Sequence, residues 1–264
     1  MAILGFIGMG NMGTAMLSGT KNIFGNDNII FHRNSKEKMI ELGEKEGIKY
    51  CESNAEVVKN AKYVILAVKP QMFEKIADEI STHLTTENII ISLAPGFTIE
   101  QLTGMFNTGR IVRCMPNTPA MVGEGMTGVS FEKSNFDNNE IDNIIKIFES
   151  IGRMSIVDEK LINSVVCASG SSPAYVFMFI EALADSVVKC GLSRKEAYTF
   201  VAQTVLGSAK LMLETGRHPA ELKDMVCSPG GTTIAGVEEL EKNGFRKAIF
   251  SATSACFNKC NNIK

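Results

Sequence analysis

The stretch Ile3-Leu-Gly-Phe-Ile-Gly8-Met-Gly10-Asn-Met-Gly13 decides the fold of the first half of the chain. Its apolar run predicts a buried strand, and the pattern G-x-G-x-x-G follows at once, ahead of a helical pattern. In that setting Gly8 permits a tight turn, Gly10 lets the backbone approach a pyrophosphate, and Gly13 lets the helix pack closely. The dipole of the following helix favours an anion. We therefore predict a dinucleotide site, with a glycine turn kept only for packing as the alternative.

Alternation of strand and helix patterns continues to about residue 157. It predicts a doubly wound, mostly parallel sheet of the Rossmann type with helices on both faces. After residue 157 the strand signals stop and only helical segments follow, so the predicted domains are 1–157, which binds the dinucleotide, and 158–264, which is all helical. The predicted strands are residues 3–7, 29–31, 63–68, 89–93, 110–115, 126–131 and 154–157.

Helices of the second half carry apolar residues on more than one face. Within 194–214 one set falls at Ala197, Phe200, Val201 and Val205, and another begins at Leu206. A single chain of this size seldom buries so many two-faced helices, so we expect at least a homodimer formed through the helical domain.

Composition narrows the class of protein. With a formal net charge of −2 the chain lacks the basic field that attracts nucleic acid, so we expect no nucleic-acid partner. The seven cysteines are scattered without Cys/His spacing for a metal, which predicts reduced thiols and no metal site. No secretory signal is recognisable, and residues 173–188, interrupted by Glu181 and Asp185, are expected to fall short of a membrane span. A cytoplasmic protein is expected.

The end of the second predicted strand indicates the choice of cofactor. An NAD enzyme usually places an acid there for the ribose hydroxyls, whereas this chain has His32-Arg-Asn-Ser35. Arg33 could pair with a 2′-phosphate, and Asn34 or Ser35 could donate to it. NADPH is therefore favoured and NADH stays possible; the alternative is a solvated turn in which Ser35 caps the next helix.

Two further loops follow predicted strands, where ligands bind in such folds: residues 67–70 and 93–96. Lys69, the one charge in an apolar stretch, either contacts the cofactor or extends into solvent from a strand end. Asn54, which follows Ser53 near a predicted helix start, is a candidate helix cap. The cofactor contacts predicted from these segments are Gly8, Gly10, Asn11, Arg33, Asn34, Ser35, Ala67, Val68, Lys69, Pro70, Leu93 and Ala94.

One segment of the second half carries a specific resemblance: Pro219-Ala-Glu-Leu-Lys-Asp-Met-Val-Cys-Ser228-Pro-Gly-Gly231-Thr-Thr233-Ile-Ala-Gly-Val-Glu-Glu-Leu-Glu241. Along its whole length it resembles the signature of pyrroline-5-carboxylate reductases. Residues 6–16, 67–70, 113–119 and 169–175 resemble the same family in the same order. The resemblance implies NAD(P)H-dependent reduction of the C=N bond of 1-pyrroline-5-carboxylate to L-proline, by homodimers that often assemble further.

The resemblance also implies cofactor contacts at Gly8, Gly10, Met12, Asn54, Ala67 and Lys69. It implies substrate contacts at Ser228, Gly231, Thr232 and Thr233, with Gly230 in the same loop. A Pro-Gly-Gly turn before a helical pattern offers free backbone N–H groups to a carboxylate, while the alternative is that Ser228 or Thr232 caps the helix. Thr233 is the predicted catalytic residue, facing the ring nitrogen, because a protonated imine needs orientation more than a strong acid. Glu159 is a further predicted substrate contact, or an acid that complements a helix dipole.

Two other functions remain open on sequence grounds. A related β-hydroxyacid dehydrogenase would carry a catalytic lysine on the first long helix of the second domain, and residues 173–189 have no lysine before the far end. A non-catalytic dinucleotide sensor would show a degraded substrate loop, and residues 228–233 are intact.

Overall fold

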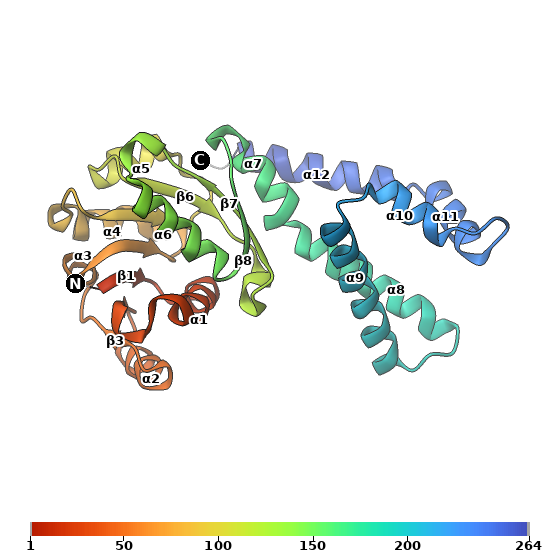
Figure 1. Ribbon diagram of the computed structural model, residues 1–264, viewed down its shortest axis with the longest axis horizontal. Helices are drawn as coiled ribbons and strands as arrows, with labels where there is room; N and C mark the ends of the chain where they lie inside the picture. Colours follow the sequence, from red (N-terminus) through yellow and green to blue (C-terminus); the bar gives the residue numbers. More distant parts are fainter. Residues whose placement is uncertain (1, 263–264) are drawn as a thin grey trace. The chain divides into compact units, whose positions relative to one another are not determined.

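Eight strands form one sheet in the order β3-β2-β1-β4-β5-β6-β7-β8, parallel throughout except where β6 pairs with β7 (Figure 1). The computed structural model describes residues 2–262. The strands are β1 Ala2–Ile7, β2 Ile29–His32, β3 Lys49–Tyr50, β4 Ala61–Leu66, β5 Ile89–Ser92, β6 Ile111–Met115, β7 Gly125–Ser130 and β8 Gly152–Ile156. The doubly wound, mostly parallel sheet expected from the alternating pattern is confirmed.

Two details of the strand prediction were wrong. The strand expected at residues 63–68 is β4, which pairs with β1 and β5 over 61–66, so Ala67 and Val68 lie in the loop that follows it. Strand β3 was not predicted at all. It is two exposed residues long and pairs only with β2, so it has no apolar run and no alternation to reveal it.

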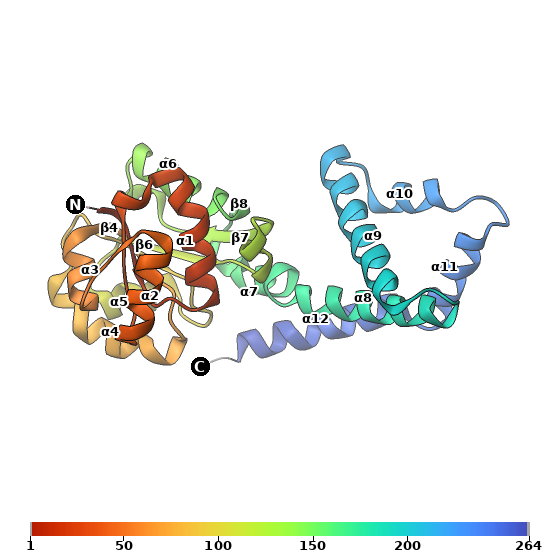
Figure 2. The ribbon, with the colours of Figure 1, turned by 90° about the horizontal axis from the view of Figure 1, so that it is seen from below.

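Helices cover both faces of the sheet. Alternate residues of the same strand belong to two different cores: Leu4 and Phe6 face one, and Ile7 faces the other. Helices α1 Asn11–Phe24, α2 Lys36–Glu46 and α6 Asn138–Glu149 fill the first core. Helices α3 Asn54–Asn60, α4 Phe73–Ile80 and α5 Ile99–Phe106 fill the second (Figure 2). Burial on both faces explains why the strands read as continuous apolar runs.

The position of β1 in the sheet creates a crevice. From β1 the chain builds β2 and β3 on one side and then crosses to β4 and β5 on the other. The loops after β1 and β4 therefore leave the sheet in opposite directions at a topological switch point, where doubly wound folds bind ligands.

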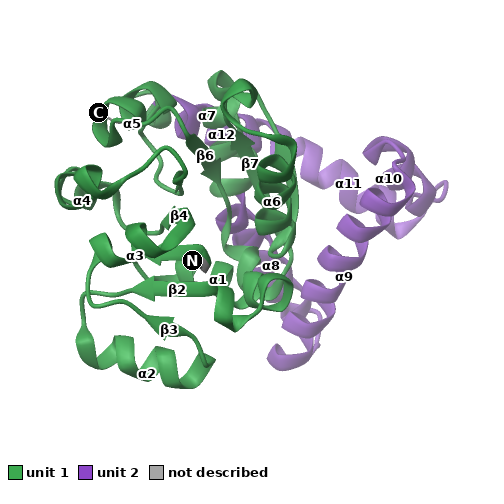
Figure 3. Ribbon diagram, turned by 60° about the vertical axis from the view of Figure 1, so that its left-hand side comes forward, with its two compact units in different colours: residues 1–171, 259–264 green, residues 172–258 purple. Residues whose placement is uncertain are grey.

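By its internal contacts the chain divides into a first unit, residues 1–171 with 259–264, and a second unit, residues 172–258 (Figure 3). Residues 158–171 belong with the first unit because the short helix α7 Ile162–Val165 packs on β6 and β7. A short π-helix, Val166–Gly170, follows α7. The domain boundary expected after residue 157 lies just past the last strand and remains a prediction.

The second unit is entirely helical in its described residues. Its helices are α8 Ser172–Lys189, α9 Arg194–Thr215, α10 Pro219–Val226, α11 Thr232–Lys242 and α12 Phe245–Asn261, whose last residues belong to the first unit. Helices α8 and α9 pack together around Ala184, Ala197 and Val201, the small buried core of this unit. Large apolar side chains are exposed on all five helices, among them Phe177 and Met178 on α8, Phe200 on α9 and Phe250 on α12.

The helical run Glu159–Lys189 corrects one expectation. By length and composition alone it could cross a membrane, whereas the apolar part of it was expected to fall short of a span. A single helix of this kind is weak evidence for a membrane protein, because core helices of other proteins pass the same test.

Candidate functional site

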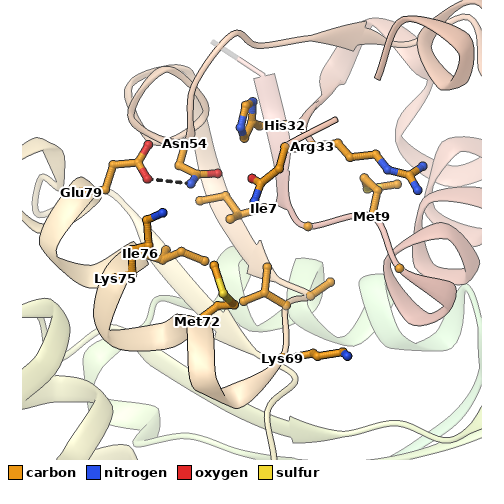
Figure 4. A pocket seen from close by; sticks show the side chains of 15 residues that line it. Ile7, Met9, His32, Arg33, Asn54, Lys69, Met72, Lys75, Ile76 and Glu79 are labelled. Atoms are coloured by element: carbon orange, nitrogen blue, oxygen red, sulfur yellow. Dashed lines mark hydrogen bonds between the residues drawn. The ribbon is translucent and has the colours of Figure 1, made fainter. Parts of the chain in front are cut away.

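A pocket of about 550 Å³ opens at the switch point, at the carboxyl ends of β1, β2 and β4 (Figure 4). Its floor is the glycine turn after β1. Its walls are the turn after β2, the loop after β4, the start of α3 and one side of α4. The lining residues are Ile7, Gly8, Met9, Gly10, His32, Arg33, Asn34, Asn54, Ala67, Val68, Lys69, Met72, Lys75, Ile76 and Glu79.

The three glycines of the turn differ in what they permit. Gly8 has φ +88°, and a Cβ there would lie 2.4 Å from Val68 Cγ1. A Cβ on Gly13 would lie 2.6 Å from the carbonyl oxygen of Gly8, so this glycine allows α1 to approach the turn. Gly10, in contrast, has no heavy atom within 4 Å of such a Cβ, so it keeps space open above the backbone.

Helix α1 begins beside that open space with its first N–H groups available. Its N-cap is Gly10, no side chain among residues 2–262 caps it, and its first turn contains no acid. An uncapped helix start with positive dipole character is a site for a phosphate. The steric and electrostatic features of the turn thus fit the pyrophosphate of a dinucleotide.

The turn after β2 supplies a cation to the pocket. Arg33 and Asn34 both line it, as predicted, and Figure 4 shows Arg33 extending over the glycine turn near Met9. Ser35 does not line the pocket. It is the N-cap residue of α2, but its side chain makes no capping bond in the described structure. His32 also lines the pocket; its Nδ1 lies 2.9 Å from the Cys51 carbonyl, an acceptor, so Nδ1 carries the proton.

Asn54 lines the pocket from the start of α3. It is the first residue of α3 and is buried, and the helix is capped by Ser53, whose Oγ accepts from the Glu56 N–H at 3.1 Å. The alternative that Asn54 itself caps the helix is therefore wrong. Its Nδ2 donates instead to Oε2 of Glu79 at 2.9 Å, the dashed line in Figure 4.

Not every predicted cofactor contact reaches the pocket. Gly8, Gly10, Arg33, Asn34, Asn54, Ala67, Val68 and Lys69 line it, while Asn11, Met12, Ser35, Pro70, Leu93 and Ala94 do not. Contact with a bound cofactor remains a prediction for all of them. Sequence reasoning missed the wall formed by Met72, Lys75, Ile76 and Glu79. Their helical spacing directly after the 67–70 loop was the signal that could have found them.

Glu159 has two partners in the first unit. It lies in the turn Glu159–Leu161, and its Oε1 accepts from Arg113 Nη1 at 2.9 Å and from the N–H of Ile99 at 2.6 Å. Since Ile99 is the first residue of α5, the carboxylate complements the dipole of that helix. A substrate contact by Glu159 remains a prediction.

In the second unit, the Ser-Pro-Gly-Gly turn ends at the start of α11. Gly230 has φ +66°, the Gly231 N–H donates to the Ser228 carbonyl at 3.0 Å, and Gly231 is the N-cap residue. No side chain of the described chain caps this helix, so the alternative that Ser228 or Thr232 does so is wrong. Thr232 and Thr233 are its first two residues and are exposed. Free N–H groups beside two hydroxyls suit a carboxylate ligand.

Comparisons with known proteins agree with this geometry. Residues 159–263 match the family described as pyrroline-5-carboxylate reductase dimerisation, and residues 3–96 match the family described as NADP oxidoreductase coenzyme F420-dependent. The pyrroline-5-carboxylate reductase of Escherichia coli K12 is 44% identical over 262 residues, 97% of this chain and 96% of the relative.

Two solved structures of reductases are similar to this chain in fold and in sequence. A pyrroline-5-carboxylate reductase from Coxiella burnetii has a TM-score of 0.92 and 32% identity, covering 100% of this chain and 98% of that one. A Plasmodium falciparum pyrroline carboxylate reductase with NADP bound has a TM-score of 0.87 and 33% identity, covering 99% and 98%. The chain belongs to the pyrroline-5-carboxylate reductase family.

Proposed function

We infer that the chain reduces the ring C=N bond of 1-pyrroline-5-carboxylate to L-proline, the last step of proline biosynthesis, with NAD(P)H as reductant. The observation that carries this function is the 44% identity to a reductase of that name over 97% of the chain. The relatives support this activity and neither the hydroxyacid dehydrogenase nor the sensor considered on sequence grounds.

The first unit would bind the cofactor. When bound, a nicotinamide dinucleotide supplies a hydride. The start of α1 would hold the pyrophosphate beside Gly10, where the structure leaves space for it. Arg33 would pair with a 2′-phosphate, which favours NADPH over NADH. Arg33→Ala should therefore weaken binding of NADPH and leave that of NADH unchanged; equal weakening of both would contradict the assignment.

The second unit would hold the substrate at the start of α11. The N–H groups of its first turn, with Ser228 and Thr232, would bind the substrate carboxylate. The Thr233 hydroxyl would accept a hydrogen bond from the protonated ring nitrogen. This nitrogen carries the positive charge that attracts hydride, so the site needs no strong acid at the reacting carbon. Orientation of the two reactants can supply on the order of 7 kcal/mol or more.

We further propose that the chain works as a homodimer through the second unit, or as a higher homo-oligomer. Support comes from the match to the dimerisation family over 159–263 and from the exposed apolar side chains of α8, α9 and α12. A second copy on these helices would also explain the apolar run Glu159–Lys189 without a membrane. The net charge of −2 argues against nucleic acid as a partner.

A cytoplasmic location completes the proposal. It rests on the odd number of cysteines, seven, which suits a reducing compartment. Cell fractionation tests it, and recovery of the protein in a membrane fraction after a salt wash would contradict it.

An isotope experiment tests the reaction itself. The chain is incubated with racemic 1-pyrroline-5-carboxylate and NADPH in which both hydrogens at C4 of the nicotinamide are deuterium, so that either of them can be the hydride transferred. Because one hydride is transferred to the imine carbon, the product should be L-proline with a single deuterium at C5. Unlabelled proline, or label at another carbon, would contradict direct hydride transfer to the C=N bond.

A further inference from the structure

One buried polar atom in the dinucleotide pocket has no partner within residues 2–262: Oδ1 of Asn54. The residue is only 6% exposed and lines the pocket. A buried acceptor without a hydrogen bond destabilises the protein, so such an atom in a binding pocket points to a donor on the ligand. The rest of the Asn54 amide is already engaged, since Nδ2 donates to Glu79.

The chemistry of Glu79 decides which end of the amide faces the pocket. A carboxylate only accepts hydrogen bonds, so the amide end that faces it must be the nitrogen. The oxygen must then point the other way. Ser53, and not Asn54, caps α3, so the Asn54 side chain is not held by the backbone N–H groups at the helix start. Glu79 therefore fixes Asn54 as an acceptor toward the pocket, although Glu79 itself is on α4 and exposed.

Side chains of different polarity line the pocket. Arg33 and Lys75 contribute cations that can pair with a phosphate, whereas Oδ1 of Asn54 contributes an acceptor, which cannot bind one. Oδ1 therefore selects an N–H or O–H group of the ligand and not its phosphates.

We propose that Glu79 is a positioning residue for the dinucleotide. It holds the Asn54 amide so that Oδ1 accepts a hydrogen bond from a donor on the adenosine half, either the 6-amino group of adenine or the 3′-hydroxyl of the ribose. The proposal rests on the dinucleotide assignment of the proposed function, and it does not depend on which imine is reduced.

Direct binding to the full chain without imine tests it. The dissociation constants of NADPH, of its hypoxanthine analogue, which lacks the 6-amino group, and of its 3′-deoxy analogue are measured by nicotinamide fluorescence. The unmodified chain should bind one analogue about 10-fold more weakly than NADPH, because that analogue leaves Oδ1 unpaired. The analogue that is penalised identifies the donor.

The variants separate positioning from general damage. Glu79→Ala lets the amide rotate, so NADPH should bind about 10-fold more weakly while the penalty on the analogue falls to about 2-fold or less. Glu79→Gln can still accept from Nδ2 and should restore part of the discrimination. Glu74→Ala removes a carboxylate from the same helix outside the pocket and should change neither value. In an Asn54→Ala background, Glu79→Ala should have no further effect.

Two results would overturn the inference. One is a loss of affinity after Glu79→Ala that is equal for NADPH and both analogues, which would make Glu79 merely structural. The other is the absence of any penalty on either analogue in the unmodified chain. Both results leave NADPH binding and imine reduction by the unmodified chain intact, whereas a chain that binds no NADPH would contradict the proposed function as well.

Discussion

At the scale of single residues, Thr233 is positioned by the first turn of helix α11. It is the second residue of α11, and its exposed hydroxyl stands beside N–H groups that no side chain in residues 2–262 caps. A ligand at this helix start can therefore receive backbone N–H groups and a side-chain hydroxyl at once.

Replacement of Thr233 by alanine should lower kcat and leave the dissociation constant of NADPH unchanged. The lost hydrogen bond to a charged ring nitrogen is worth about 1.5–3 kcal/mol, which corresponds to a decrease in kcat of about 10- to 150-fold. Thr233→Ser keeps the hydroxyl and should retain most of the activity. Steady-state kinetics and fluorescence titration measure the two quantities. An equal loss of turnover and of cofactor affinity would show that the threonine supports the fold.

Residue predictions from the sequence succeeded where a motif implies its own geometry. The three glycines of the motif have the surroundings expected from it: a positive φ at Gly8, open space at Gly10 and close packing at Gly13. The Asn54–Glu79 bond joins residues 25 positions apart, and only the packing of α3 against α4 brings them together. Glu159 illustrates the same limit, because its contacts with Arg113 and Ile99 depend on how β6 and α5 lie in the folded sheet.

At the scale of elements, the start of α1 makes the different roles of Gly10 and Gly13 testable. Gly10→Ala adds a methyl group to open space, so the free energy of unfolding should change by less than about 1 kcal/mol. NADPH affinity should fall about 10-fold or more, because the methyl group lies where the pyrophosphate approaches. Gly13→Ala forces a Cβ to within 2.6 Å of a carbonyl oxygen and should destabilise the fold itself.

Thermal unfolding and cofactor titration of both variants decide the matter. If Gly10→Ala destabilised the chain as much as Gly13→Ala, Gly10 would be required for the fold and not for ligand binding.

Helix α6 begins with a capping box that also carries a buried charge cluster. Asp137 is its N-cap residue, and Oε2 of Glu140, a residue only 3% exposed, accepts a hydrogen bond from the Asp137 N–H at 3.0 Å. Burial alone would raise the pKa of Glu140, but bonds from Lys62 at 2.7 Å, from the Asp137 N–H and from Arg110 outweigh it and lower the pKa. The ionised carboxylate therefore stabilises the folded chain.

Glu140→Gln keeps the capping geometry and removes the charge. At pH 7 it should lower the free energy of unfolding by about 1–3 kcal/mol. Because the folded pKa lies below the unfolded one, this contribution is present above about pH 4.3 and is lost as the pH falls through the folded pKa. Urea unfolding from pH 7 to 3 measures it, with Glu149→Gln at the exposed end of α6 as control. A difference that does not shrink with acid would contradict the role of the charge.

Element predictions worked best for buried strands, whose apolar runs are set by helices on both faces. Strand β3 could not be predicted, because its two exposed residues show no strand pattern. They form a strand only by pairing with β2. Met72 and the α4 residues that line the pocket were not predicted, because only the order of the strands in the folded sheet brings them to the crevice.

At the scale of the whole molecule, the exposed apolar side chains of the second unit predict self-association. Light scattering at micromolar concentration should give at least twice the mass of one chain. Phe200, 62% exposed on α9, should be covered in the assembly, so Phe200→Asp should shift the mass toward the monomer. Gln203→Asp introduces the same charge at an exposed position of the same helix and should have less effect. A monomeric unmodified chain would contradict the proposal.

The overall architecture followed from the sequence because the change from alternating elements to helices alone marks a change of fold class at about residue 157. The division by contacts falls later, at residue 171, because α7 packs on the sheet although it has no strand pattern. Which apolar faces stay exposed in one chain could not be read from helical periodicity, since the same pattern marks a core helix and an interface helix.

The most direct test of the central claim is the initial rate of NADPH oxidation with racemic 1-pyrroline-5-carboxylate, beside matched reactions with NADH and with a 2-ketoacid. The account predicts rapid oxidation with the cyclic imine, a higher rate with NADPH than with NADH, and none with the ketoacid. No oxidation with the imine, while NADPH still binds, would contradict it.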